Sequence, residues 1–133
     1  MIEFTKAEEK FLQFLEEARI ATSHNDMPHV KPVAYVYHKG IIFTASDYDT
    51  RTYKNLKINP KISAVIDVYE PGNHKAVCIQ GNTEILENGK EFLEIYKIFD
   101  KKFAWVRNDP WKENEAVFIK IIATHKISWG LKG

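Results

Sequence analysis

The chain has 133 residues, of which 44% are hydrophobic and 28% are charged, and this composition fits one globular domain spanning residues 1–133. Its formal net charge of +1 comes from 19 basic and 18 acidic side chains without long runs of one sign, which argues against nucleic acid or a membrane surface as a partner. A single cysteine, Cys78, excludes an intramolecular disulfide, and the acidic N-terminus and short apolar stretches predict a cytoplasmic protein.

The first half of the chain predicts one helix followed by short strands. Residues 5–18 are expected to form the helix, because Thr5 and Glu8 have capping-box spacing and apolar side chains recur at helical spacing after them. Turn residues at 23–28 and at Lys39–Gly40 separate segments rich in β-branched and aromatic side chains. The extended segments expected here are residues 19–23, 29–38 and 41–45.

The next segment is a short helix that begins with basic side chains. Asp49 or Thr50 is the expected N-cap, and the helix must end before Pro60. Arg51 and Lys54 then lie in the first turn, where each cation costs roughly a few tenths of a kcal/mol beside the positive end of the helix dipole. A bound anion would remove that cost, which suggests a phosphate site. A solvated basic helix without a ligand is the alternative interpretation.

The second half of the chain predicts two strands, a long helix and a closing strand. Gly81 indicates a bulge or a point of close approach, and Asn88 is the expected N-cap of the helix. The apolar stripe of this helix consists of Phe92, Ile95, Tyr96, Phe99 and Phe103. The strands expected here are residues 62–69, 76–86 and 115–129, with an irregular segment over 104–115. The order predicts a mainly β (α+β) fold, a small antiparallel barrel with helices at its rim.

Several common kinds of site find no support in this sequence. His24 and His29 flank Asp26, but no further carboxylate or cysteine completes a metal coordination sphere, so no metal is expected. The serines lack a nucleophile-elbow context, and the six glycines form neither a dinucleotide-binding fingerprint nor a P-loop. A phosphate site in this chain must therefore use side chains and a helix end.

Five segments, taken in order, resemble the pyridoxamine 5'-phosphate oxidase-like FMN-binding split β-barrel family. They are PHVKPVAYVY (28–37), GIIFTAS (40–46), TRTYKNLKINPKISAVI (50–66), CIQGNTEIL (78–86) and ISWG (127–130). The most specific motif is Arg51-x-x-Lys-Asn-Leu-x-x-Asn-Pro60, which leads into an apolar strand. The resemblance covers roughly residues 5–131 and implies an antiparallel split barrel that forms a homodimer, with FMN in a cleft between the two subunits.

The resemblance also implies which residues bind the cofactor. They are Lys31, Val33, Ala34, Phe43, Thr44, Ser46, Arg51, Thr52, Lys54, Asn55 and Trp129. Arg51 matches the basic phosphate ligand, while Thr52 stands where many members have a second basic residue, which Lys54 or Lys31 could replace. Val33 and Ala34 match backbone contacts to the flavin ring, and Trp129 is expected to reach the cofactor of either subunit. A glutamine that some members place at the start of the strand before Gly81 is missing, because Lys75 and Ala76 stand there, and Gln80 could serve instead.

The resemblance implies an FMN-dependent oxidoreductase of unassigned small-molecule substrate, with NAD(P)H as a possible electron donor and no catalytic residue identified. Authentic pyridoxamine phosphate oxidases carry a C-terminal segment with arginine and histidine residues, whereas this sequence ends in ISWGLKG, so vitamin B6 oxidation is not expected. Three alternatives stay open. The deazaflavin F420 would place an acidic tail over the basic turn, haem would need His24, His29 or His125 as axial ligand, and a non-enzymatic flavin-binding module would recruit a partner.

Overall fold

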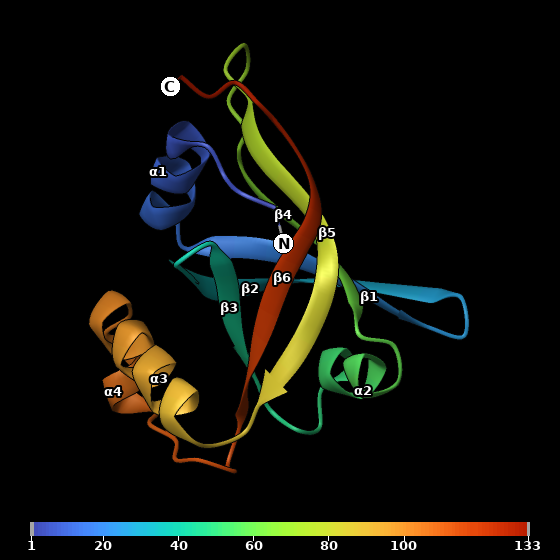
Figure 1. The fold of residues 1–133 in the computed structure, drawn as a ribbon, viewed down its shortest axis with the longest axis vertical. Helices are drawn as coiled ribbons and strands as arrows, with labels where there is room; N and C mark the ends of the chain where they lie inside the picture. The colour runs from blue at the N-terminus through green and yellow to red at the C-terminus, as the bar shows by residue number, and fades with distance from the viewer. Residues whose placement is uncertain (1, 133) are drawn as a thin grey trace.

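Six antiparallel strands close into a barrel in this computed structural model, which describes residues 2–132 (Figure 1). Around the barrel the strands follow the order β1-β2-β3-β6-β5-β4. The strands are β1 (Glu17–His24), β2 (Met27–His38), β3 (Ile41–Ser46), β4 (Lys61–Val68), β5 (Lys75–Leu86) and β6 (Val117–Trp129). The helices are α1 (Lys6–Phe14), α2 (Arg51–Ile58), α3 (Lys90–Lys102) and α4 (Trp105–Asn108). The predicted antiparallel barrel with flanking helices is therefore confirmed.

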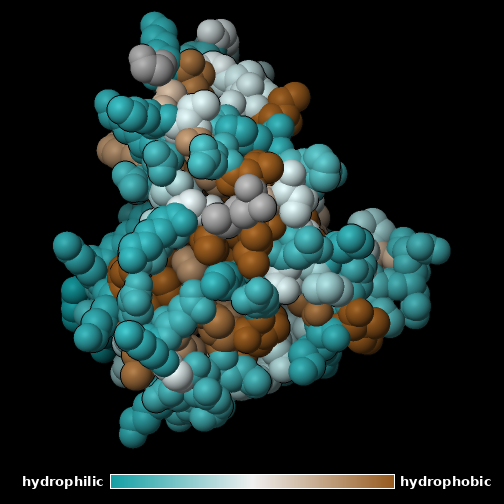
Figure 2. All heavy atoms as spheres, in the orientation of Figure 1, coloured by the Kyte–Doolittle hydropathy of each residue, from teal (hydrophilic) through white to brown (hydrophobic). Residues whose placement is uncertain are grey.

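Two apolar cores stabilise this arrangement. One fills the barrel with side chains from alternate strand positions, such as Ile20, Ile66 and Ile119, each at most 1% exposed. The other lies outside the barrel, where the apolar stripe of α3 packs against the outward side chains of β2, β3 and β6, including Phe43 and Phe118. The stripe predicted for the second long helix is therefore core. On the face that Figure 2 shows, hydrophilic side chains surround smaller groups of hydrophobic ones.

The capping residue Glu8 fixes α1 over one end of the barrel. Its carboxylate receives hydrogen bonds from Lys126 Nζ (2.5 Å) and Ser128 Oγ (2.6 Å), and its Oε1 receives the Thr5 amide of the predicted capping box (2.8 Å). Burial alone would raise the pKa of Glu8, but these hydrogen bonds and the Lys126 charge outweigh it and lower the pKa. In Figure 1, α1 lies at one end of the barrel and α2 at the other.

The structure differs from the sequence-based expectations most clearly in the first helix, at the start of α3 and in the segment after α3, while several strand ends differ by about two residues. The first helix ends at Phe14 instead of residue 18, because Ala18 alternates with Ile20 as an inward residue of β1. Gly89 with φ 95°, and not Asn88, is the N-cap residue of α3. The one-turn helix α4 lies within the segment expected to be irregular. Ala18 fits the helical spacing by coincidence, because inward-facing strand residues are apolar as well.

The close approach predicted at Gly81 is present. The pairing of β5 with β6 shifts register between Gln80 and Gly81, and a Cβ atom on Gly81 would lie 2.1 Å from the carbonyl oxygen of Ile122. Only glycine fits there without a backbone movement. Separately, none of the helices within residues 2–132 is long and apolar enough to cross a membrane.

Candidate functional site

The basic helix start predicted from the sequence exists as a capped N-terminus at α2. Thr50 is the N-cap, and its Oγ1 accepts a hydrogen bond from the Tyr53 amide (3.1 Å) and lies 2.7 Å from Ser46 Oγ. The first turn contains no acidic residue, while Arg51 and Lys54 are both exposed. First-turn amides have no partner within the helix, so this turn offers positive charge and free donors together.

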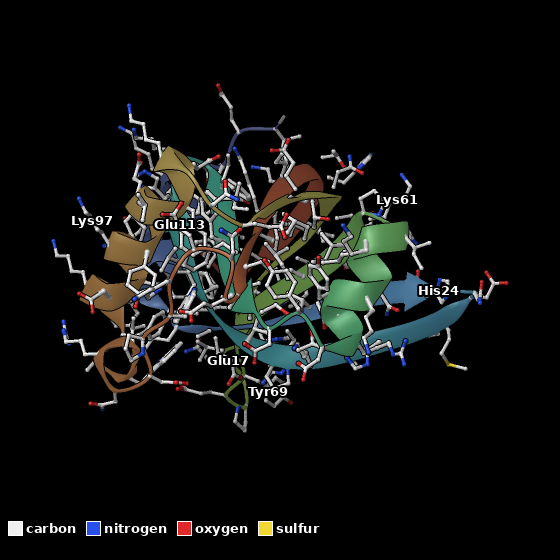
Figure 3. All side chains as sticks on the ribbon, turned by 90° about the horizontal axis from the view of Figure 1, so that it is seen from below. Glu17, His24, Lys61, Tyr69, Lys97 and Glu113 are labelled. Carbon is white, nitrogen blue, oxygen red and sulfur yellow. The ribbon has the colours of Figure 1, made fainter. Side chains whose placement is uncertain are left out.

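A hollow of about 290 Å³ opens beside this turn. It lies between β2, the end of β3, the N-cap of α2 and the segment that leads into β6. Its lining residues are Lys31, Ala45, Ser46, Asp47, Thr50, Trp105, Asp109, Trp111, Glu115 and Ala116. We call it the tryptophan cleft. Figure 3, seen from below, shows α2 and the α3–α4 pair on opposite sides of this end of the barrel.

The predicted site residues divide into those at the cleft and those buried behind it. Lys31 and Ser46 line the cleft, and Arg51 directly follows the lining residue Thr50. Thr52 and Asn55 instead lie on the buried face of α2, at 0% and 2% exposure. Whether these residues contact a cofactor stays a prediction.

On the buried face of α2, the two polar side chains differ in their hydrogen bonding. Asn55 Nδ2 donates to Thr22 Oγ1 of β1 at 3.0 Å, which ties the helix to the barrel. Thr52 Oγ1 is buried and has no hydrogen-bond partner among the residues that the structure describes. A buried hydroxyl without a partner costs about 1–3 kcal/mol. Thr52 is uncharged and its side chain faces the barrel, so it does not replace the second basic residue that many family members have at this position.

The predicted flavin-lining residues of β2 and β3 are largely built into the two cores. Phe43 is 2% exposed and packs in the outer core beneath α3, with Ala34 against the same cluster, whereas Val33 packs against the barrel interior. Thr44 Oγ1 donates to the Ala34 carbonyl oxygen at 2.7 Å. The structure does not bring these side chains into the cleft, and the backbone contacts expected at Val33 and Ala34 stay a prediction.

Trp129 lies far from the cleft within one chain. It ends β6, whereas Glu115 and Ala116 of the cleft precede the start of the same strand. Its ring is 41% exposed and meets His74 edge-on at a centroid distance of 5.2 Å. Within a single chain, Trp129 is therefore too far from the cleft to contact a cofactor bound there.

Sequence reasoning missed the wall of the cleft formed by the segment after α3. Trp105 and Trp111 stack there with ring centroids 6.3 Å apart and an interplanar angle of 17°. The carboxylates of Asp109 and Glu115 lie beside them in the lining. The only available signal was two tryptophans close together in an otherwise polar segment, which does not reveal that the segment folds back against β3.

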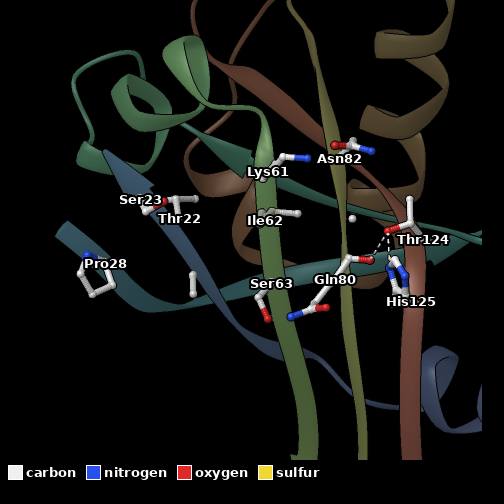
Figure 4. A pocket seen from close by; sticks show the side chains of 12 residues that line it. Thr22, Ser23, Pro28, Lys61, Ile62, Ser63, Gln80, Asn82, Thr124 and His125 are labelled. Carbon is white, nitrogen blue, oxygen red and sulfur yellow. Dashed lines mark hydrogen bonds between the residues drawn. The ribbon is translucent and has the colours of Figure 1, made fainter. Parts of the chain in front are cut away.

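A larger hollow of about 470 Å³ lies on the outer surface of β1, β4, β5 and β6 (Figure 4). Its lining includes Gln80, the expected substitute for the missing glutamine, and His125, one of the three histidines considered for haem. Polar side chains dominate its centre. Thr124 Oγ1 donates to the Gln80 carbonyl oxygen at 3.2 Å and lies 3.0 Å from His125 Nδ1. Within residues 2–132 no group of three histidine, cysteine, aspartate or glutamate residues is placed to hold a metal ion.

Comparison with known proteins adds a family and a set of similar folds. The family model for pyridoxamine 5'-phosphate oxidase matches residues 4–126 of the chain. No curated protein matches the chain. Among solved structures, the haem storage protein HutZ from Vibrio cholerae is similar with a TM-score of 0.80 at 13% identity, covering 98% of this chain and 96% of that one.

Two further solved structures have the same fold. A FAD-binding protein from Mesorhizobium loti has a TM-score of 0.74 at 21% identity, covering 94% of this chain and 93% of that one. A conserved hypothetical protein from Mycobacterium tuberculosis has a TM-score of 0.77 at 21% identity, covering 97% of this chain and 86% of that one. At these identities the similarity concerns the fold, and the ligand of this chain has to be argued from its own residues.

Proposed function

Because the chain belongs to the pyridoxamine 5'-phosphate oxidase family, we propose that it is a flavoprotein which binds FMN at the α2 end of the barrel and acts as an oxidoreductase on a small molecule. The observation that carries this proposal is the first turn of α2, where Arg51 and Lys54 extend from a capped helix start that borders the tryptophan cleft. Such a turn suits the phosphate of FMN.

The phosphate group would gain two kinds of contact at this turn. The free first-turn amides supply fixed donors, and the exposed Arg51 guanidinium supplies charge-assisted hydrogen bonds, which are about twice as strong as neutral ones. Lys31 lines the cleft from β2 and adds a further cation to those of Arg51 and Lys54. When bound, the isoalloxazine supplies the electron chemistry, so the chain's own residues need only bind and orient it and exclude water.

Adding FMN to the purified protein tests this proposal. We expect flavin fluorescence to be quenched with one FMN bound per chain, or the isolated protein to be yellow already. Bleaching of the bound flavin by NADH or NADPH without oxygen would then distinguish an oxidoreductase from a flavin-binding module. A colourless protein that leaves FMN fluorescence unchanged would refute the flavin proposal.

Haem is a second candidate, because the haem storage protein HutZ has a similar fold. It would need an axial ligand, and His24, His29 and His125 are partly or fully exposed. The absorption spectrum of the isolated protein separates the cases, since haem gives a Soret band and FMN a flavin spectrum. F420 is distinguished from FMN by mass after extraction.

We further propose that the chain forms a homodimer through the outer face of β4, β5 and β6. The cross-strand rows on this face join Val65 to Cys78 and Cys78 to Ile127, and Ile127 is 63% exposed. Trp129 on the same face is 41% exposed. A single chain leaves these apolar side chains in water, which a second copy would correct.

The substitution Ile127→Glu is expected to weaken this dimer at least about tenfold, because a charge would replace an apolar contact in both copies. Light scattering coupled to size-exclusion chromatography at low micromolar concentration measures the shift toward monomer. Ile58→Glu is the matched control, since Ile58 is similarly exposed at 67% but lies on α2. A wild-type protein that is monomeric while fully loaded with FMN would contradict a site shared between subunits.

A further inference from the structure

We propose that the tryptophan cleft contains, beside the FMN phosphate site, a subsite for a planar organic cation, which defines the substrate class of the proposed oxidoreductase. This inference deepens the proposed function, but the subsite is formed by residues of one chain and does not require bound flavin. Its elements are the stacked indoles of Trp105 and Trp111 and the carboxylates around them.

The indole wall is rigid on one side and accessible on the other. Trp111 is supported from behind by Tyr96 and Phe118, at centroid distances of 4.9 and 5.6 Å, and its amide lies 3.3 Å from the Tyr96 hydroxyl oxygen that accepts its hydrogen bond. Trp105 stacks on Trp111, has the Phe103 ring at a centroid distance of 5.9 Å, and remains 43% exposed. An exposed indole held in place by its neighbours offers a π-face, which attracts cations more strongly than the other aromatic side chains do.

The charges of the lining select the sign of the ligand. Asp47, Asp109 and Glu115 supply three carboxylates, whereas Lys31 is the one cation among the lining residues, all of which lie in the described part of the chain. None of these four side chains forms an ion pair within residues 2–132. A cation beside the indoles would therefore be attracted by both the rings and the carboxylates, and an anion would be repelled.

The two proposed ligands would use different walls of the cleft. Arg51 and Lys54 follow the N-cap of α2, where the phosphate is proposed and where Asp47 is the one lining carboxylate. On the other wall, Trp105 belongs to α4 and Asp109 is the C-cap residue of that helix. The volume of about 290 Å³ is at the lower limit of ligand pockets. It suits a single-ring group such as a pyridinium, and not a second nucleotide.

The closing experiment compares two nearly isosteric probes, the 1-methylnicotinamide cation and neutral nicotinamide, by calorimetry or by NMR on flavin-free protein. We expect the cation to bind about tenfold more tightly, since cation–π attraction and nearby carboxylates both act on charge. Trp105→Leu is expected to weaken cation binding about three- to thirtyfold, while Trp105→Phe keeps part of it. Phe14→Leu, which changes an exposed aromatic side chain on α1 outside the cleft, should leave cation binding unchanged.

The outcomes distinguish this inference from the flavin proposal. Equal affinity for the two probes, or a loss in Phe14→Leu as large as in Trp105→Leu, would overturn the cation subsite. FMN binding by Trp105→Leu should match wild type, which also shows that this variant is folded. A protein that binds the cation but not FMN would refute the flavin proposal alone, and one that binds FMN but not the cation would refute the subsite alone.

Discussion

Gly81→Ala is expected to destabilise the protein by about 4 kcal/mol, which is toward the upper end of single-substitution effects. The added methyl group would lie 2.1 Å from the Ile122 carbonyl oxygen and 3.0 Å from the Ala123 Cα atom. Both obstacles are backbone atoms of the paired strand, so no side-chain rotation relieves the contact, and β5 must move away from β6. Urea unfolding followed by circular dichroism measures the change.

The neighbouring substitution Gln80→Ala is the matched control for Gly81→Ala. Gln80 stands on the other side of the same register shift but is exposed, so its replacement should change the free energy of unfolding by about 0.5 kcal/mol or less. If Gly81→Ala cost no more than Gln80→Ala, the close approach of β5 to β6 at this point would be wrong.

Arg51→Ala is expected to weaken FMN binding by about 1.5 to 3 kcal/mol, which is the typical contribution of a hydrogen bond to a charged group. Arg51 is the first residue of α2 and is exposed, so the fold should be unaffected by its loss. Flavin fluorescence titration of the variant against wild type measures the change. The effect should be smaller at high salt, because exposed charges are screened.

Lys57→Ala provides the control for Arg51→Ala on the same helix. Lys57 is also exposed and cationic, but it lies in the last turn of α2, where a cation favours the helix dipole and is far from the proposed phosphate. Its loss should leave FMN affinity nearly unchanged. Equal losses in both variants would indicate a general charge effect, and no loss in Arg51→Ala would move the phosphate site away from the start of α2.

The residues of the barrel show why its strands could be predicted. Ile62, Ala64 and Ile66 alternate with more exposed neighbours because a strand points successive side chains to opposite faces, and this period is written locally. The end of the first helix could not be predicted in the same way. Ala18 is apolar in either conformation, and only its burial inside the barrel assigns it to β1.

In the candidate site, too, some features could be predicted from nearby residues and others could not. The capped basic start of α2 depends on residues close in sequence, so Thr50, Arg51 and Lys54 could be identified without coordinates. The placement of Trp105 and Trp111 beside Lys31 and Ser46 depends on segments far apart in the chain. Rules based on neighbouring residues cannot predict which remote segments come together, and for this reason the acidic, aromatic side of the cleft was missed.

The sequence by itself determined the period of each strand, the cap and charge of the α2 start, and the need for glycine at position 81, because each follows from short-range geometry or side-chain size. The tertiary structure alone decided which of these features face a common hollow. The tertiary structure buries the side chains of Thr52 and Asn55 on the inner face of α2 and places Trp129 at the end of β6 far from the cleft. It also brings Trp105 and Trp111 close to the start of α2. Barrel closure causes this, since it fixes the distances between strands that are remote in the chain.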